Sequence, residues 1–206
     1  MPTDALLRWR SERSAALDSL EAVHARVTGK KPGRQHATEH LNSALFLRLA
    51  AEFQGFCRDL HTDAVLAIVA DPSHVPGSDV RRRIFMSSLR RNRKLDVGNA
   101  SPSNIGNDFL YLGLTLWADV RARYPTRGPG WNATLEDLNA VRNAIAHSDE
   151  AKLVVVRARH PLTLRTYRTW RSSLNAAATG FDNVVRAYLQ DLTANVNAGG
   201  QNHGAA

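Results

Sequence analysis

The chain has 206 residues, 43% hydrophobic and 22% charged, a balance typical of one globular domain and not of a disordered chain. Its net charge of +8 fits a polyanionic partner such as nucleic acid and a solvated basic surface about equally. The single cysteine excludes an internal disulfide, and no apolar run approaches the ~20 residues of a membrane span. We therefore expect a cytoplasmic protein with no membrane partner.

Helical spacing of apolar residues predicts α-helices along nearly the whole chain. The first runs over about 4–28, with Thr3 as its N-cap. In the next, apolar residues step by three or four from Leu41 to Ala67, which draws one continuous stripe. This helix ends before Asp71, because a proline follows.

Two further helices are predicted in the middle of the chain. A shorter one covers roughly 79–93 after Ser78, and a second runs from Ser103 to about Arg123, stopped by Pro125. The second is apolar nearly all round, so we expect it to lie centrally in the fold.

The C-terminal third continues this pattern. Thr134 is predicted to cap a helix over 135–147, and a last helix runs over about 164–192. Leu153–Val156 is β-like but too short to support a sheet. The polar, Gly- and Ala-rich residues 194–206 are predicted to form a flexible tail. Because we find no repeat or boundary, we predict one all-α domain over 1–193.

Three polar residues of the helix over 135–147 lie off its buried stripe: Arg142, Asn143 and His147. At about 100° per residue, Asn143 and His147 share a face, so Asn143 is expected to orient the imidazole. Arg142 is rotated from His147 by about 140°, so one helix does not easily bring both to one phosphate. Either the helix ends near His147 and lets it swing, or a two-fold dimer combines residues from two chains.

The run Arg142-Asn143-Ala144-Ile145-Ala146-His147 resembles the signature of the HEPN superfamily: Arg, a polar residue, three others, then His. The run Ala50-Ala51-Glu52-Phe53-Gln54-Gly55-Phe56 looks like the second long helix of RiboL-PSP-type HEPN domains. The resemblance covers about 38–192. It implies a HEPN-like helical bundle to which this chain adds an N-terminal helix.

The resemblance also implies a function, a metal-independent endoribonuclease that acts as a homodimer, in the role of a toxin or RNA-degrading defence effector. The ribose 2′-OH attacks its own phosphodiester in a cleft shared by both chains, and no cofactor is needed. His147 can move a proton at neutral pH, and Arg142 can stabilise the charge on the transition state. Asn143 would fix the tautomer of the imidazole ring.

Two carboxylates are candidate supporting residues. Asp149 stands where some HEPN toxins carry a Tyr that a partner nucleotidyltransferase modifies with AMP, so that mode of control is in doubt here. An antitoxin or regulatory protein of another kind then remains as a partner. Glu52 could hold Arg142 or shape the cleft, or be an ordinary boundary carboxylate paired with an arginine.

Two other motifs were weighed. The basic cluster Arg90, Arg91, Arg93 and Lys94 could bind RNA phosphates or be a solvated face. His36-Ala37-Thr38-Glu39-His40 matches an inverted zinc-protease motif, but Thr38 as an N-cap would leave His36 outside the helix, so we predict no metal site. The alternatives to a nuclease are a non-catalytic HEPN module that binds RNA or protein, and a purely structural helical adaptor.

Overall fold

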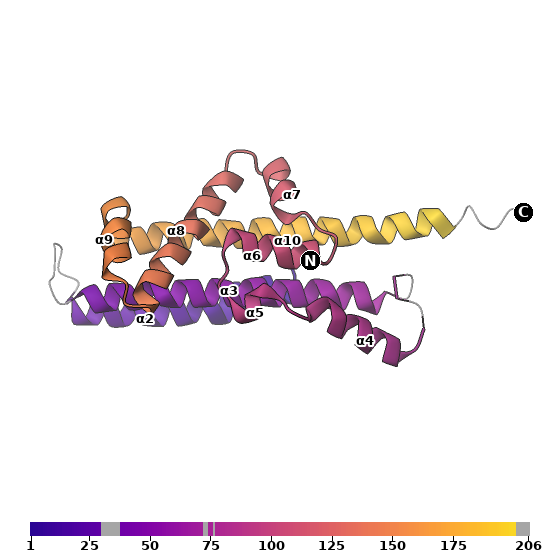
Figure 1. The fold of residues 1–206 in the computed structure, drawn as a ribbon, viewed down its shortest axis with the longest axis horizontal. Helices are drawn as coiled ribbons and strands as arrows, with labels where there is room; N and C mark the ends of the chain where they lie inside the picture. The colour runs from indigo at the N-terminus through magenta and orange to yellow at the C-terminus, as the bar shows by residue number, and fades with distance from the viewer. Residues whose placement is uncertain (30–37, 72–73, 76, 201–206) are drawn as a thin grey trace, which may run out of the picture.

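The computed structural model describes residues 1–29, 38–71, 74–75 and 77–200, and over these ranges the chain forms helices and no strand. The prediction of an all-α fold is confirmed. Figure 1 shows an elongated bundle in which two long helices, α3 (Glu39–Ala70) and α10 (Leu164–Gly200), lie along the length of the molecule.

Helix α3 is the centre of the hydrophobic core. It begins directly after Thr38 and ends before Asp71, as the sequence predicts. It packs against α10, against the N-terminal helices and against the helices from the middle of the chain. Because it has partners on several sides, it buries more than one stripe: Leu45, Phe46, Leu49, Phe53, Phe56, Cys57, Leu60, Ala64 and Val65.

The N-terminal helix contains a π-helical turn. Helices α1 (Asp4–Arg8) and α2 (Ser14–Val27) are joined by η1 (Trp9–Arg13) without a break. The predicted cap is confirmed, since the Thr3 hydroxyl accepts from the Leu6 N–H at 3.3 Å.

Spacing of the residues that face α3 explains the π turn. Ala5, Trp9, Arg13 and Leu17 follow one another every four residues, and each is buried or half-buried. On an α-helix, with 3.6 residues per turn, such a series drifts around the axis. A turn with an extra residue restores the alignment, so that all four face the same neighbour.

The remaining helices are shorter. They are α4 (Asp79–Arg90), α5 (Lys94–Val97), α6 (Pro102–Leu110), α7 (Leu116–Arg123), α8 (Gly128–Ala146) and α9 (Glu150–Arg159). Helix α4 packs against α3 at one end of the molecule, and α9 follows α8 at the other end (Figure 1). Helices α7 and α8 both pack against α10.

Two predictions for the middle of the chain were wrong. The helix expected over 103–123 is divided into α6 and α7, because Gly113 has φ +82° and only glycine adopts this conformation without strain. The helix expected over 79–93 ends at Arg90, and Asn92, with φ 59°, turns the chain into α5.

The predicted start of the helix over 135–147 was wrong. Thr134 is not a cap: α8 begins at Gly128 with a proline in its first turn, and the Thr134 hydroxyl donates to the Gly130 carbonyl at 2.9 Å. The β-like run lies inside helix α9, which starts at the Asp149 cap. Residues 194–200, expected to be a flexible tail, continue α10, while 201–206 lie outside the described residues.

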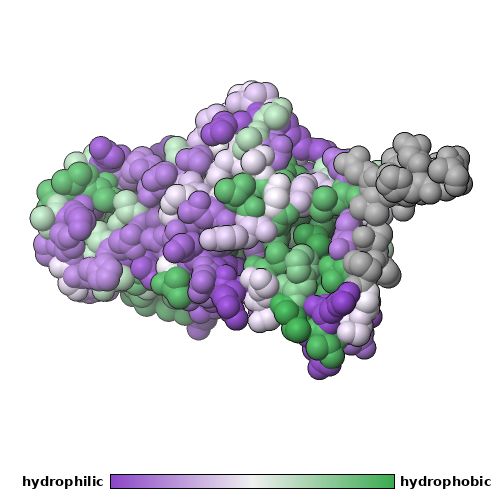
Figure 2. Space-filling model, turned by 45° about the vertical axis from the view of Figure 1, so that its right-hand side comes forward, coloured by the Kyte–Doolittle hydropathy of each residue, from purple (hydrophilic) through white to green (hydrophobic). Residues whose placement is uncertain are grey.

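The face drawn in Figure 2 is hydrophilic over much of its extent, and hydrophobic side chains gather in several patches on it. Figure 2 shows hydrophobic surface toward the end of the molecule where α4 lies, next to strongly hydrophilic residues. Among the exposed hydrophobic residues are Val80, Ile84 and Phe85 of α4, and Val154 and Val155 of α9.

Candidate functional site

The predicted site lies at the C-terminal end of α8. This helix turns Leu135, Leu138, Val141 and Ala144 into the core. Its polar residues therefore face outward. Arg142 and Asn143 are half-buried, and His147, the residue after the last helical one, is exposed.

Arg142 is held by its neighbour. Its Nη1 donates to Asn143 Oδ1 at 2.9 Å. Within the described residues, Arg142 forms no ion pair with a carboxylate. Its positive charge is therefore not neutralised by the protein, which is the condition for binding an anionic group.

Asparagines attach the loop between α5 and α6 to this face of α8. Asn99 Nδ2 donates to Asn143 Oδ1 at 3.3 Å, and Asn139 Nδ2 donates to the Ala100 carbonyl at 2.9 Å. Asn104 Nδ2 in turn donates to the Asn99 carbonyl at 2.9 Å. This chain of amides fixes the position of Asn143, and through it that of the Arg142 guanidinium.

The end of α8 has a defined geometry. The N–H of Asp149 bonds to the Ala144 carbonyl at 2.9 Å, and the N–H of Ser148 bonds to the Ile145 carbonyl at 3.2 Å. With Ser148 at φ 51°, this is a Schellman motif, in which Ser148 occupies the position that glycine usually takes. His147 is thus the C-cap, and its backbone is held where α8 turns into α9.

The structure corrects the expected role of Asn143. Its amide oxygen faces Arg142 and Asn99, and no hydrogen bond joins it to the His147 ring in the described part of the chain. The imidazole has no hydrogen-bond partner among these residues and lies in solvent. Asn143 therefore positions the guanidinium, not the imidazole. Among the described residues, no hydrogen bond joins the His147 ring to Arg142 or to Asn143.

Asp149 caps the helix that follows. Its Oδ1 accepts from the Lys152 N–H at 3.0 Å, and its Oδ2 pairs with Lys152 Nζ at 2.8 Å. The pKa of Asp149 lies below its ordinary value, chiefly because Lys152 donates from its side chain and its backbone, with a smaller contribution from His147. Asp149 thus supports the turn after His147.

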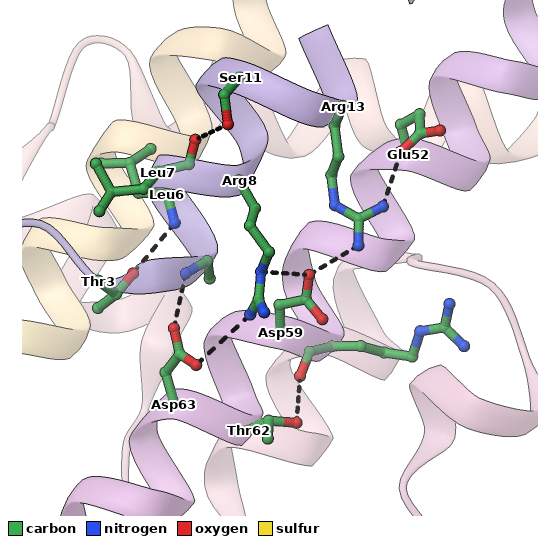
Figure 3. A network of polar contacts seen from close by, with 12 residues as sticks. Thr3, Leu6, Leu7, Arg8, Ser11, Arg13, Glu52, Asp59, Thr62 and Asp63 are labelled. Carbon is green, nitrogen blue, oxygen red and sulfur yellow. Dashed lines mark hydrogen bonds and ion pairs between the residues drawn. The ribbon is translucent and has the colours of Figure 1, made fainter. Parts of the chain in front are cut away.

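Glu52 has other partners than Arg142. Its carboxylate pairs with Arg13 Nη1 at 2.7 Å and with Arg48 Nη2 at 2.6 Å, the former visible in Figure 3. The expectation that Glu52 holds Arg142 was wrong. The alternative, a boundary carboxylate paired with arginine, is what the structure contains.

The network around Glu52 joins the π turn to α3 (Figure 3). Arg13 Nη2 also pairs with Asp59 at 2.7 Å, and Arg8 lies 3.5 Å from the same carboxylate. Burial lowers the pKa of Arg13, but Asp59 and Glu52 outweigh it and raise the pKa above its ordinary value. Sequence reasoning missed this network. Gly55 was the available signal, because a glycine inside a long helix indicates close approach of another group.

One residue of the basic cluster is buried, and the other three are exposed. Arg93 is only 7% exposed: its Nε and Nη2 hold Asp96 at 3.0 and 2.7 Å, and its Nη1 donates to the Arg58 carbonyl. Its expected role in binding RNA is therefore corrected to fixing α5 on α3. Arg90, Arg91 and Lys94 are exposed.

Other expectations concern metals and membranes. Among the described residues, no group of three or more His, Cys, Asp or Glu could hold a metal ion. Of the zinc-protease motif, His36 lies outside the described residues, and Glu39 pairs with Arg157 at 2.5 Å. None of the described helices combines the length and apolar character needed to cross a bilayer.

Comparison of the chain with protein-family models, with curated proteins and with solved structures found no match.

Proposed function

We propose that the chain is a metal-independent endoribonuclease of HEPN type, with Arg142 and His147 as its catalytic residues. The proposal is best supported by the partners of Arg142 and the exposure of His147. Arg142 is fixed by Asn143 but has no carboxylate partner among the described residues, and His147 is exposed at a defined helix end. An arginine without a carboxylate partner can bind an ionised phosphate, and an accessible imidazole can accept or donate a proton.

The reaction follows from these groups. His147 accepts the proton of a ribose 2′-OH, and the 2′ oxygen attacks the adjacent phosphorus. The bond from phosphorus to the 5′ oxygen breaks, and that oxygen takes a proton. The products are a 2′,3′-cyclic phosphate and a 5′-OH. Arg142 stabilises the additional negative charge on the phosphoryl oxygens as the transition state forms.

Two copies of the chain would supply what one copy lacks. The reaction needs a proton acceptor and a proton donor, and a single His147 serves as only one of them at a time. A second copy contributes another His147. Helix α9 begins three residues after His147 and exposes Val154 and Val155, 64% and 58% accessible, which a second copy would cover.

The proposal extends to the biological role given by the resemblance. We place the chain in the cytoplasm as a toxin or defence effector that degrades RNA, controlled by an antitoxin or another regulatory protein. The non-catalytic HEPN module and the structural adaptor are the competing functions.

Substitution at the two catalytic positions tests the activity. Purified protein is incubated with total RNA in EDTA, next to Arg142→Ala and His147→Ala. We expect the wild type to cleave RNA and the cleavage rate to fall at least about 100-fold in each variant, because each variant lacks one of the two catalytic side chains. The matched controls are Arg127→Ala and His40→Ala, which remove exposed residues of the same types elsewhere on the chain.

The other outcomes separate the alternatives. Cleavage that survives His147→Ala contradicts the mechanism. Binding of RNA that weakens with salt, without cleavage, identifies a non-catalytic module. A structural adaptor shows neither binding nor cleavage.

A further inference from the structure

Helix α4 has two different faces. Its inner stripe, Met86 and Leu89, packs against the core. Its outer stripe consists of Val80, Ile84 and Ser87, which lie at i, i+4 and i+7 and so share one side of the helix. Val80 and Ile84 are 56% and 66% exposed, and no residue of α4 is fully buried.

Arginines border the apolar part of this outer face. Arg81 and Arg83 flank Ile84 on either side of the stripe, and Arg90 and Arg91 lie at its end. None of these four forms an ion pair within the described residues. Asp79, the one acidic residue of the helix, pairs with Arg82 at 2.6 Å. The outer face therefore combines exposed hydrophobic area with unneutralised positive charge.

A hollow lies beside the C-terminal end of α4, next to the outer face and bordered by Asp96 of α5. It has a volume of about 400 Å³ and is lined by Met86, Ser87, Arg90, Arg91 and Asp96. The Asp96 carboxylate accepts from Nε and Nη2 of Arg93, and these bonds lower the pKa of Asp96. Its charge is thus balanced, and Arg90 and Arg91 determine the sign of the potential in the hollow.

We propose that the outer face of α4 is a docking surface for an acidic amphipathic helix of a partner protein. Leucine-like side chains on one stripe of that helix cover Val80 and Ile84. Carboxylates bordering the stripe face Arg81 and Arg83. A further carboxylate enters the hollow beside Arg90 and Arg91. This surface does not depend on the proposed nuclease activity.

Three other occupants fit the surface less well. A second copy of this chain that used the same face would bring two sets of arginines together, which is repulsive. The flat surface of an anionic bilayer would leave the hollow unfilled. Nucleic-acid phosphates would pair with the arginines but would leave Val80 and Ile84 uncovered.

The test uses a fluorescein-labelled, hydrocarbon-stapled 16-residue peptide with Leu at i, i+4, i+7 and i+11 and Glu at the flanking positions. Binding to the full chain is measured by fluorescence anisotropy. We expect micromolar affinity, weakened at least tenfold by Val80→Ser/Ile84→Ser and by Arg90→Ser/Arg91→Ser. All four positions are exposed, so these variants are expected to fold, which circular dichroism checks.

Matched controls lie at the opposite end of the molecule, on α2. Val27→Ser and Arg26→Ser remove an exposed valine and an exposed arginine there, and are expected to leave the affinity unchanged. The same peptide with Lys in place of Glu is expected not to bind.

Several results would overturn the proposal. These are no binding of the Glu peptide, equal binding of the Lys peptide, and affinity that the α4 variants do not change. Anionic vesicles or a 16-nucleotide oligouridylate are measured in parallel. Tighter binding of either through Val80 and Ile84 would assign the face to a membrane or to nucleic acid instead. RNA cleavage plays no part in the readout, so failure here and failure of the nuclease proposal are distinguishable.

Discussion

Arginine side chains in this chain differ most in what neutralises them. Arg13 and Arg93 each hold carboxylates at hydrogen-bond distance and join helices together. For either to bind a phosphate, those carboxylates would have to be displaced. Arg142 is instead held by a neutral amide, which orients its guanidinium without cancelling its charge. Whether an arginine here binds a carboxylate or a neutral amide therefore decides whether its charge is available to a ligand.

The buried histidine of α3 makes the stability depend on pH. His61 is almost fully buried, and its Nε2 lies 3.2 Å from the Asp108 carbonyl. Burial, followed by the charge of Arg93, lowers the pKa of His61 to about 4. The unfolded chain therefore binds a proton near pH 6.5, whereas the folded chain does so only near pH 4, and stability is lost as the pH falls through this interval.

Urea unfolding at pH 7 and pH 4.5 measures this effect. The His61 contribution is expected to lower the free energy of unfolding of the wild type by about 2 kcal/mol at the lower pH. His61→Gln keeps a donor for the Asp108 carbonyl and does not titrate. Between pH 7 and pH 4.5, the free energy of unfolding of this variant should therefore fall by about 2 kcal/mol less than that of the wild type. Equal pH dependence of the two proteins would show that His61 is not the group responsible.

At the scale of elements, apolar spacing predicted the helices well wherever the helix had one clear stripe. The bounds of α3 were predictable because the stripe is regular and Asp71 is followed by proline. The division at Gly113 was not, since a single glycine inside an apolar run does not reveal its φ angle. The run Leu153–Val156 is β-like locally, but the Asp149 cap and packing of Leu153 decide for a helix.

The candidate site was predictable only in part. The sequence places Arg142 and Asn143 in the last turns of one helix and His147 at its end, as the structure has them. The amides of Asn99 and Asn104 come from another segment, and such tertiary contacts leave no periodic pattern in the sequence. For that reason the partner of Asn143 was predicted wrongly.

The ion pairs that connect η1 to α3 can be tested by adding one methyl group to α3. A Cβ at Gly55 would lie 2.3 Å from Arg13 Nη1, so Gly55→Ala would push the guanidinium off Glu52 and Asp59. We expect a destabilisation of about 2 kcal/mol in chemical unfolding. Gly130→Ala is the matched control, because nothing lies within 4 Å of that position. It should be stabilising by up to about 1 kcal/mol. A stabilising Gly55→Ala would contradict the role of Arg13.

At the scale of the whole molecule, the exposed hydrophobic residues of α4 and those of α9 lie at opposite ends of the bundle (Figure 1). The α9 end carries the candidate site and is the end we assign to a second copy. The α4 end, with its arginines, is the one we assign to an acidic partner. One elongated chain could thus hold both contacts at the same time.

Sedimentation measures the expected dimer. The 22.7 kDa chain is expected to sediment with about twice that mass. Val154→Asp/Val155→Asp should return it to the monomer, since burying two carboxylates in an apolar contact is costly. Val80→Asp on α4, an exposed valine at the opposite end of the bundle, is the control and should remain dimeric. A monomeric wild type under the conditions of cleavage would contradict a shared site.

Cleavage of matched oligonucleotides tests the central claim most directly. One strand is RNA, and the other has the same sequence with every 2′-OH methylated; both are incubated with the protein in EDTA. The proposed chemistry predicts that only the RNA is cut, leaving 2′,3′-cyclic phosphate ends, and that His147→Ala cuts neither strand. Cutting of the methylated strand, or no cutting of any RNA by the wild type, would contradict it.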